Sequence, residues 1–344
     1  SYCYSYSKIK ENIHNFKKNF KSFSPLICFA VKSNTNTNII KEIKKFGLGA
    51  DVVSIGELMA ALKAGISPDK IVFSGVGKTS SEISFAIKKK ILLINAESLS
   101  EIKVIDKIAK LKNKKINIGV RLNPNTDAKT ISQISTGKKG NKFGVNKNTF
   151  YEIVHYCKNS KNIDLKCLSV HIGSQILDHK PYEKMLKAVS LILDSLDHQF
   201  EYIDLGGGMG IRYSKNNKNL NYKKYNKAII KFLSKHNVKI IFEPGRSIIG
   251  NSGTLITKVI YIKDSGKKKF IILDAAMNDL MRPALYGASH RTLPVIKTNK
   301  IANKPYEFVG PICESTDKFI TLKKFQELNE KDLIAICDVG AYGM

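Results

Sequence analysis

The sequence predicts an α/β fold: a closed (β/α)8 TIM barrel followed by a smaller β domain. Two observations predict it. Short apolar runs alternate with lysine-rich amphipathic segments from residue 26 to residue 243, as strands followed by helices do. After residue 250, strand-like runs follow one another with turns between them and no helical segments. Eight strand-then-helix units favour a closed barrel over an open doubly wound sheet.

The predicted barrel strands are short and rich in Ile, Val and Leu. They are Leu26–Val31, Ala50–Val53, Lys70–Phe73, Ile91–Ile94, Ile116–Arg121, Lys166–His171, Tyr202–Leu205 and Lys239–Phe242. Amphipathic segments such as Asn38–Phe46 and Gly56–Ala64 supply the helices. Strands start 20 to 25 residues apart early in the chain, and about 50 apart between the fifth and the sixth. The glycine- and lysine-rich stretch Thr136–Gly144 is therefore predicted to be an insertion.

We expect two domains, a barrel over residues 10–250 and a β domain over residues 251–344. The expected strands of the β domain are Thr254–Lys263, Lys269–Asp274, Tyr306–Gly310 and Leu333–Val339. Residues 1–9 contain a similar alternating run, Tyr2–Ser5, which we expect to pair into the β domain.

The formal charge of +28 raises the question of nucleic-acid binding. Lysines account for 52 of the 57 basic residues and are spread along the whole chain, which indicates a compositional bias. Their longest runs carry no interleaved aromatic residues that could stack on bases, so we expect no nucleic-acid partner. The five arginines (Arg121, Arg212, Arg246, Arg282 and Arg291) are expected at sites that need a planar, bidentate group.

Membrane insertion and secretion are not expected either. No stretch approaches the roughly 18 consecutive apolar residues that a membrane helix needs, and the first residues show no basic region followed by an apolar one. The six cysteines have no paired or CxxC spacing. This pattern predicts free thiols in a reducing compartment, and therefore a cytoplasmic location.

Barrel active sites lie at the carboxyl ends of the strands. Nearly every predicted strand here ends in a polar residue or in glycines: Lys32, Ser54, Ser74, Asn95, Arg121, His171 with Ser174, Gly206–Gly208 and Glu243. Lys32 is the most informative of them. At the end of a buried strand, desolvation favours the neutral amine, which is the form that attacks carbonyl groups.

The segment Asp204–Gly210 contains consecutive glycines after a strand, but neither the GxGxxG order nor a following helix of a dinucleotide site. Exposed backbone N–H groups of such glycines can instead cradle a phosphate. A reactive lysine, a phosphate cradle and the carboxylate of Glu243 together suggest pyridoxal phosphate. His171 could stack on the cofactor ring, or it could be a structural histidine; the residues alone leave both readings open.

Eight motifs in this order resemble a known family. They are Phe29-Ala30-Val31-Lys32-Ser33-Asn34, Gly49-Ala50-Asp51-Val52-Val53-Ser54, His171-Ile172-Gly173-Ser174-Gln175, Gly206-Gly207-Gly208, Glu243-Pro244-Gly245-Arg246, Met281-Arg282-Pro283-Ala284-Leu285-Tyr286, Cys313-Glu314-Ser315-Thr316-Asp317 and Gly340-Ala341-Tyr342. The chain resembles, over its whole length, the alanine-racemase-like barrel decarboxylases (group IV, with an alanine racemase/ornithine decarboxylase-like fold). Among them it is similar to the branch that acts on diaminopimelate.

The resemblance implies pyridoxal 5'-phosphate as the cofactor and assigns residues to it. Lys32 would carry the cofactor covalently, and His171 would stack on its ring. Glu243 would keep the pyridine nitrogen protonated, which makes the ring a full electron sink. The phosphate would be held by Ser174, Gly206, Gly207, Gly208, Gly245 and Arg246, and Asp51 and Tyr342 complete the cofactor-binding set. No metal is implied.

The implied reaction is decarboxylation of meso-2,6-diaminopimelate at its D-centre to L-lysine and carbon dioxide, the last step of lysine biosynthesis. Arg246 and Arg282 would bind the distal carboxylate, and Glu314 the distal ammonium. Tyr286 and Tyr342 complete the substrate-binding set. Cys313 would reprotonate the carbanion. In the family, the Cys-Glu segment enters the site from the partner subunit, which implies a homodimer.

Two kinds of alternative function follow from the same residues, and a separate expectation concerns the length of the chain. The chain could act on another D-amino acid or on a carboxynorspermidine-type substrate, although Arg282 together with Glu314 argues against this. It could also be a non-catalytic homologue that binds pyridoxal phosphate. Finally, the family continues for some tens of residues past the position of Met344, so we expect this sequence to be a fragment of a longer chain whose β domain is truncated here.

Overall fold

The structure is a computed structural model that describes residues 1–137, 140–214 and 217–343. The chain divides into two compact units. The barrel unit comprises Ile13–Gly210 and Asn219–Ile248. The β unit comprises Ser1–Asn12, Ile211–Lys218 and Ile249–Met344. The β unit thus includes a short stretch between two barrel elements, which the predicted boundaries place in the barrel.

Eight parallel strands close into the predicted barrel, in the order β2-β3-β4-β5-β6-β7-β8-β9. They are β2 (Leu26–Ala30), β3 (Gly49–Val52), β4 (Ile71–Phe73), β5 (Leu93–Ala96), β6 (Ile116–Arg121), β7 (Ile163–Ser169), β8 (Tyr202–Asp204) and β9 (Lys239–Phe242). Pairing of β2 with β9, with Leu26 opposite Ile241, closes the ring. The (β/α)8 prediction is therefore confirmed.

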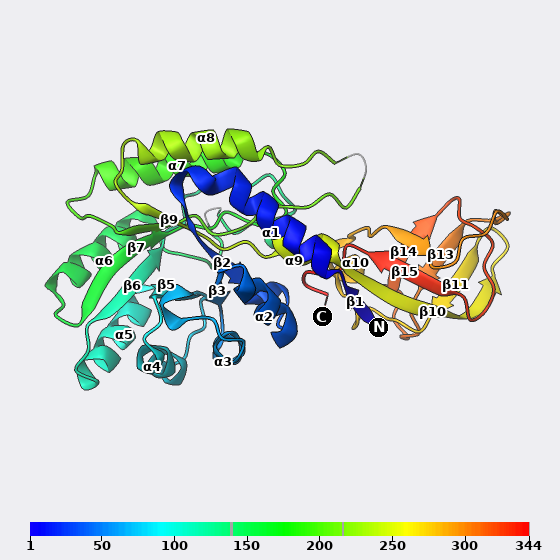
Figure 1. Ribbon diagram of the computed structural model, residues 1–344, viewed down its shortest axis with the longest axis horizontal. Coiled ribbons are helices and arrows are strands. Elements are labelled where there is room, and N and C mark those ends of the chain that lie inside the picture. Colours follow the sequence, from blue (N-terminus) through cyan, green and yellow to red (C-terminus); the bar gives the residue numbers. More distant parts are fainter. Residues whose placement is uncertain (138–139, 215–216, 344) are drawn as a thin grey trace. The chain divides into compact units, whose positions relative to one another are not determined.

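Helices follow the strands and lie outside the ring (Figure 1). They are α1 (Tyr6–Phe20), α2 (Thr37–Lys45), α3 (Ile55–Lys63), α4 (Ser80–Lys89), α5 (Leu99–Leu111), α6 (Lys147–Asn159), α7 (Lys180–Asp194), α8 (Tyr222–Leu233) and the short α9 (Arg246–Ile249). Between β6 and α6, the only regular element in the described residues is a 3-10 turn, Ser132–Ile134. Residues 138–139 of the predicted insertion lie outside the described residues.

Several helices begin at a side-chain cap that follows a barrel strand. Ser54 Oγ accepts the backbone N–H of Glu57 at 3.3 Å and starts α3. Thr79 forms a capping box with Glu82 and starts α4. Satisfying these otherwise unpaired N–H groups fixes where each helix begins, and it holds the preceding strand end in place. Ser54, one of the predicted strand-end residues, is therefore a helix cap.

The barrel interior contains an apolar layer of Cys28, Val72, Leu93, Cys167 and Ile241, all fully buried. Burial, followed by the charge of Asp204, raises the pKa of both cysteine thiols well above the usual range. These two cysteines are therefore inert packing residues rather than nucleophiles.

The β unit is a seven-stranded sheet in the order β12-β15-β10-β11-β13-β14, with β1 paired to β10. Its strands are β1 (Tyr2–Tyr4), β10 (Gly253–Asp264), β11 (Lys269–Leu273), β12 (Thr292–Pro294), β13 (Tyr306–Val309), β14 (Lys318–Leu322) and β15 (Leu333–Cys337). Tyr2 lies opposite Leu255, which confirms the predicted pairing of the first residues. A core that includes Val259, Ile271 and Phe308 holds the sheet together.

Two strands and one helix of the β unit were not predicted. β12 and β14 are short, and their alternation is too brief to distinguish them from turns. The helix α10 (Arg282–Tyr286) corrects the expectation of a β domain without helices. Pro283 in its first turn favours a helical start, and Gly287 ends it with a φ of 61°.

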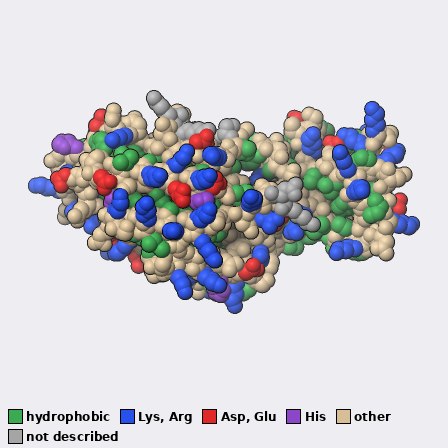
Figure 2. Space-filling model, turned by 90° about the horizontal axis from the view of Figure 1, so that it is seen from above, with side chains coloured by type: hydrophobic (Ala, Val, Ile, Leu, Met, Phe, Trp, Pro, Cys, Tyr) green, Lys and Arg blue, Asp and Glu red, His purple; other side chains and the backbone are tan. Residues whose placement is uncertain are grey.

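Within the residues that the structure describes, no helix is long and apolar enough to cross a membrane. On the face of the barrel unit that Figure 2 shows, Lys and Arg side chains are interspersed with Asp and Glu side chains. This distribution agrees with a compositional lysine bias rather than a basic patch on that face.

Candidate active site

Lys32 lies in a 3-10 turn, Val31–Ser33, directly after β2. The turn is closed by Ser33 Oγ, which donates to Ala30 O at 2.7 Å. Lys32 Nζ forms an ion pair with Oδ2 of Asp51 on the neighbouring strand β3. The Lys32 side chain is 37% exposed, whereas that of Asp51 is fully buried. The turn therefore presents a reachable amine that a buried carboxylate holds in place.

The second carboxylate oxygen of Asp51 is also informative. Oδ1 is buried and has no hydrogen-bond partner in the part of the chain that the structure describes. Leaving a buried carboxylate oxygen unpaired is costly, so such atoms usually have a functional reason. Asp51 can accept one further donor beside Lys32, either from a bound group or from water.

Two carboxyl groups lie next to each other in the barrel interior: those of Glu243, just after β9, and Asp204, the last residue of β8. Asp204 is fully buried and Glu243 is 8% exposed. Burial raises the pKa of Asp204 to about 6. Burial, and then the charges of Asp204 and Asp51, raises the pKa of Glu243 well above its usual range. Lys32 opposes this shift, which places its charge near Glu243.

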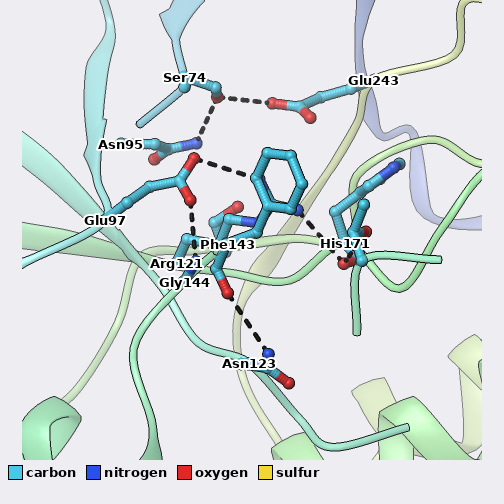
Figure 3. Close-up of polar contacts among 12 residues, drawn as sticks. Ser74, Asn95, Glu97, Arg121, Asn123, Phe143, Gly144, His171 and Glu243 are labelled. Atoms are coloured by element: carbon cyan, nitrogen blue, oxygen red, sulfur yellow. Dashed lines mark hydrogen bonds and ion pairs between the residues drawn. The ribbon is translucent and has the colours of Figure 1, made fainter. Parts of the chain in front are cut away.

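Neutral donors surround this carboxyl pair (Figure 3). Ser74 Oγ donates to Glu243 Oε1 at 3.2 Å. Asn95 Nδ2 donates to Asp204 Oδ2 at 3.0 Å and to Ser74 Oγ at 3.3 Å. The backbone N–H of Gly206 donates to Asp204 Oδ1 at 2.9 Å. Ser74 and Asn95, both predicted strand-end residues, thus orient the pair and bring no charge of their own.

His171 lies two residues beyond β7 and accepts a hydrogen bond at Nδ1 from the Gly207 N–H at 3.2 Å. Burial, followed by the charges of Arg121 and Lys32, lowers the pKa of His171 well below its usual range. The ring is therefore neutral at physiological pH, with Nε2 carrying the proton. A neutral ring held by its edge can present its face to a planar ligand.

Glycines 206–208 form a tight turn after β8 in which side chains do not fit. Gly206 and Gly208 have φ angles of 63° and 86°, which favour glycine. A Cβ on Gly207 would lie 2.1 Å from the backbone oxygen of Glu243. A Cβ on Gly245 would likewise lie 2.9 Å from the Cβ of Ser33. Such close backbone approaches are typical of phosphate-binding turns, and in this turn the N–H groups of Gly206 and Gly207 donate to Asp204 Oδ1 and His171 Nδ1.

Arg246 begins α9 beside this turn. It is 5% exposed, and its Nη2 donates to Ser174 Oγ at 3.3 Å. The structure thus brings together the barrel residues that the sequence singled out, namely Lys32, Asp51, His171, Ser174, Gly206, Gly207, Gly208, Glu243, Gly245 and Arg246.

A further ion pair at this mouth was not foreseen from the sequence. Arg121 Nη1 lies 3.1 Å from Glu97 Oε1, and both side chains are almost buried. Glu97 Oε2 accepts the N–H of Gly144 at 2.8 Å, and the Arg121 guanidinium lies 4.8 Å from the centre of the Phe143 ring. Arg121 Nη2 also donates to the carbonyl of His171 at 3.4 Å (Figure 3). Glu97 and Arg121 therefore fix the segment 143–144 and the backbone of His171 together.

The remaining predicted residues belong to the β unit. Cys313 and Glu314 lie on an exposed loop between β13 and β14. The buried carboxylate of Asp317 anchors this loop by accepting the N–H groups of Met277 at 2.7 Å and Ile312 at 2.9 Å. Arg282 lies at the start of α10 and is 7% exposed, whereas Tyr286 is half-buried and Tyr342 is 36% exposed.

The residues at the barrel mouth fit pyridoxal phosphate. An amine at Lys32 can bond to its aldehyde carbon, and the glycine turn with Arg246 can hold its phosphate. Glu243 can pair with its ring nitrogen, and Asp51 has an oxygen to spare for a polar ring substituent. No group of three or more metal-ligating side chains occurs in the described ranges.

Comparisons with known proteins agree with this geometry. The family model described as "Pyridoxal-dependent decarboxylase, pyridoxal binding domain" matches residues 6–250. The diaminopimelate decarboxylase of Helicobacter pylori strain J99 is 44% identical over 99% of this chain and 85% of its own length. That of Aquifex aeolicus is 41% identical over 99% of this chain and 81% of its own length.

Solved structures match equally well. A crystal structure of H. pylori diaminopimelate decarboxylase complexed with L-lysine superposes with a TM-score of 0.95 at 43% identity, covering 99% of this chain and 86% of that one. The crystal structure of a diaminopimelate decarboxylase from m. jannaschi gives a TM-score of 0.92 at 34% identity, covering 99% of this chain and 82% of that one.

Proposed function

Because the chain belongs to the pyridoxal-dependent decarboxylase family, and within it to the diaminopimelate decarboxylases, we propose the following reaction and division of roles. The enzyme decarboxylates meso-2,6-diaminopimelate at its D-centre to give L-lysine and carbon dioxide. Its cofactor is pyridoxal 5'-phosphate, which when bound accepts the electron pair left by the departing carboxylate. The observation that carries the proposal is the meeting of Lys32, Glu243 and the glycine turn at one barrel mouth.

Lys32 would hold the cofactor through Nζ, the amine that the 3-10 turn presents at the barrel mouth. Asp51 would support this role, because its carboxylate holds Nζ at the mouth and can accept a hydrogen bond from a protonated amine. The low exposure of Asp51 keeps water from competing for that contact.

Glu243 faces the ring nitrogen. Without a positive partner, its carboxyl group holds a proton because burial and the neighbouring carboxyl groups disfavour its charge. A ring N–H⁺ against Glu243 relieves that repulsion, so the carboxylate and the protonated nitrogen stabilise each other. His171 would pack its neutral ring against the planar cofactor and would add no positive charge beside the ring nitrogen.

The substrate-binding roles follow from the family resemblance of the residues concerned. We assign the distal carboxylate to Arg246 and Arg282 and the distal ammonium to Glu314. Tyr286 and Tyr342 complete this set. Cys313 returns a proton to the carbon that carbon dioxide leaves, which requires an accessible thiol; the side chain is exposed.

A direct test measures cofactor binding and turnover separately. The purified protein with pyridoxal phosphate should develop the absorbance band of a protein-bound imine. The band should vanish in Lys32→Ala and persist in Lys41→Ala, a matched control on an exposed face of α2. Addition of meso-diaminopimelate should then release carbon dioxide and accumulate L-lysine. No band would overturn the cofactor assignment, and a band without lysine would overturn the substrate.

We also propose that the enzyme is a homodimer in which Cys313 and Glu314 of one subunit complete the site of the other. Both residues are exposed on an anchored loop, as a donated segment must be. Mixing inactive Lys32→Ala and Cys313→Ala variants tests this. Random dimers should regain about a quarter of the wild-type activity, because half of them are mixed and each has one intact site. No recovery in a mixture that exchanges subunits would contradict shared sites.

A cytoplasmic location is part of the same proposal. All six cysteines lie in described residues, and none forms a disulfide. Free thiols persist in reducing compartments. Detection of the native protein in the cytosolic fraction of its source cells, with reduced cysteines, is the expected result.

A further inference from the structure

His290 is a buried histidine that the proposed reaction does not use. It lies in the β unit, is 2% exposed, and is held between two groups. Its Nδ1 is 3.0 Å from the carbonyl oxygen of Cys337, at the end of β15. Its Nε2 is 2.8 Å from Nη1 of Arg282, eight residues earlier in the chain.

These two contacts determine the protonation of the ring. A carbonyl oxygen can only accept a hydrogen bond, so Nδ1 must carry a proton. A guanidinium can only donate, so Nε2 must offer its lone pair. His290 is therefore the neutral tautomer with the proton on Nδ1, and it accepts a charge-assisted hydrogen bond from Arg282.

Tyr213 fixes the same arginine from another direction. The guanidinium carbon of Arg282 lies 4.4 Å from the centre of the Tyr213 ring, and Tyr213 meets His290 edge to face at 5.2 Å. One nitrogen of the guanidinium is thus held by the imidazole, and one face rests on an aromatic ring. All three residues belong to the β unit.

The choice of a neutral partner distinguishes Arg282 from two other arginines of the chain. Arg121 is paired with the carboxylate of Glu97, and Arg291 lies 3.8 Å from that of Asp338. A carboxylate partner cancels the charge of the guanidinium, whereas a neutral imidazole that accepts a hydrogen bond from it orients the group without adding a negative charge. Such an arrangement suits an arginine that must bind an anion from elsewhere.

We propose that His290 is a positioning residue that orients Arg282 toward the distal carboxylate of the substrate, with Tyr213 as the surface on which the guanidinium rests. This inference rests on the proposed function, because the distal carboxylate is a feature of diaminopimelate. The product L-lysine retains that carboxylate, and cadaverine lacks it while keeping both amines. The ratio of their dissociation constants therefore reports how well Arg282 is oriented.

Two substitutions separate orientation from structural bracing. His290→Asn can still donate to the Cys337 carbonyl through its amide but no longer reaches Arg282. His290→Gln extends its amide oxygen to the place of Nε2 and can still accept from Arg282. A structural brace requires mainly the backbone contact, so it favours Asn; orientation of Arg282 favours Gln.

The experiment uses the enzyme loaded with pyridoxal phosphate and measures L-lysine and cadaverine binding by calorimetry, with KM and kcat for meso-diaminopimelate. In His290→Asn we expect the Kd of L-lysine and the KM to rise about tenfold, since one charged hydrogen bond is lost. Cadaverine affinity should stay unchanged and kcat should change less than KM. His290→Gln should remain within about threefold of wild type in every quantity.

Two substitutions of Tyr213 test whether the ring face supports the Arg282 guanidinium. Tyr213→Leu should weaken L-lysine binding but not cadaverine binding, and Tyr213→Phe, which keeps the ring face, should do neither. Equal losses for lysine and cadaverine, or a Gln variant weaker than the Asn variant, would overturn the positioning role while the wild-type enzyme remains active. If wild type neither turns over meso-diaminopimelate nor prefers lysine to cadaverine, both the proposed function and this inference fail.

Discussion

Asp204 and Glu243 lie next to each other in the barrel interior although both are acids, and burial raises the pKa of each carboxyl group. Asp204 is fully buried and accepts hydrogen bonds from Asn95 and the Gly206 N–H. Glu243 lies on the side of Ser74 and Lys32. The two carboxyl groups can therefore hold a proton next to the position assigned to the cofactor nitrogen.

The first prediction concerns the pH dependence of stability. The pKa of Asp204 is about 6 in the folded protein, against an ordinary value of 3.8. Between these values the folded state binds more protons than the unfolded state, so stability falls as pH rises from 4 to 6. Asp204→Asn removes this contribution and lowers the pKa of Glu243, so the variant should lose less stability over that range. Urea denaturation of the cofactor-free protein at a series of pH values measures both slopes.

A control for this prediction is Asp264→Asn in the β unit. Lys304, followed by the Gly266 N–H, lowers the pKa of the exposed Asp264 carboxyl. Asp264 is therefore largely ionised in both states above about pH 5, and its removal should leave the slope between pH 5 and 6 unchanged. Parallel curves for wild type and Asp204→Asn would show that Asp204 does not hold a proton in the folded barrel.

The second prediction concerns the ion pair of Glu97 and Arg121. Glu97→Gln leaves a largely buried guanidinium without its counter-charge, so we expect a loss of about 3 kcal/mol in the free energy of unfolding. The backbone of His171 loses part of its support as well, so cofactor affinity should fall. Denaturation and titration with pyridoxal phosphate measure the two effects.

The matched control is Glu201→Gln, whose carboxylate pairs with Lys239 at 3.1 Å on an exposed surface. Exposed ion pairs contribute less than about 1 kcal/mol, so this variant should be close to wild type in both measurements. Similar losses in the two variants would contradict a specific role for Glu97.

The third prediction concerns the glycine turn. In Gly207→Ala, the new methyl group would meet the backbone oxygen of Glu243. A backbone atom cannot move aside as the end of a flexible side chain can. We expect cofactor affinity to fall at least tenfold and stability to fall by about 2 kcal/mol. Gly77→Ala, where nothing lies within 4 Å of the added Cβ, should change neither. Titration of each variant with pyridoxal phosphate and thermal denaturation provide the comparison, and normal cofactor binding by Gly207→Ala would contradict the cradle.

The fourth prediction concerns Cys313. Of the six cysteines, only Cys3 and Cys313 are exposed, so brief alkylation of the native protein should modify these two and spare the four buried thiols. L-Lysine should slow alkylation of Cys313 if that thiol lies at a substrate site, and it should not affect Cys3. Mass spectrometry of the digested protein measures both sites in one sample. Equal rates at Cys313 with and without lysine would argue against its catalytic role.

The fold and the principal site residues were predictable from the sequence because both depend on local order. Apolar runs mark the strands, and a strand end in a parallel barrel is by geometry a site position, which is why Lys32, His171 and Glu243 could be chosen. Ser54 shows the limit of that rule. A polar residue at a strand end can equally begin the next helix, and the Glu three residues later was the signal for a cap.

Other residues could not be found in this way because their partners are distant in sequence. Asp204 was visible only as the start of a glycine segment, whereas its role comes from Glu243 and Asn95, which are 39 and 109 residues away. Glu97 depends on Arg121 and Gly144. His290 and Tyr213 are 77 residues apart, and nothing in the local pattern of either connects them. Tertiary packing alone creates these relationships.

The pairing of β1 with β10 has a consequence for biosynthesis. Tyr2 finds its partner Leu255 only after about 250 further residues have been made, which takes roughly 10 to 50 seconds of translation. All eight barrel strands leave the ribosome before that partner does. The first strand of the chain is thus among the last to be incorporated, and until then its edge groups remain available to chaperones or to neighbouring nascent chains.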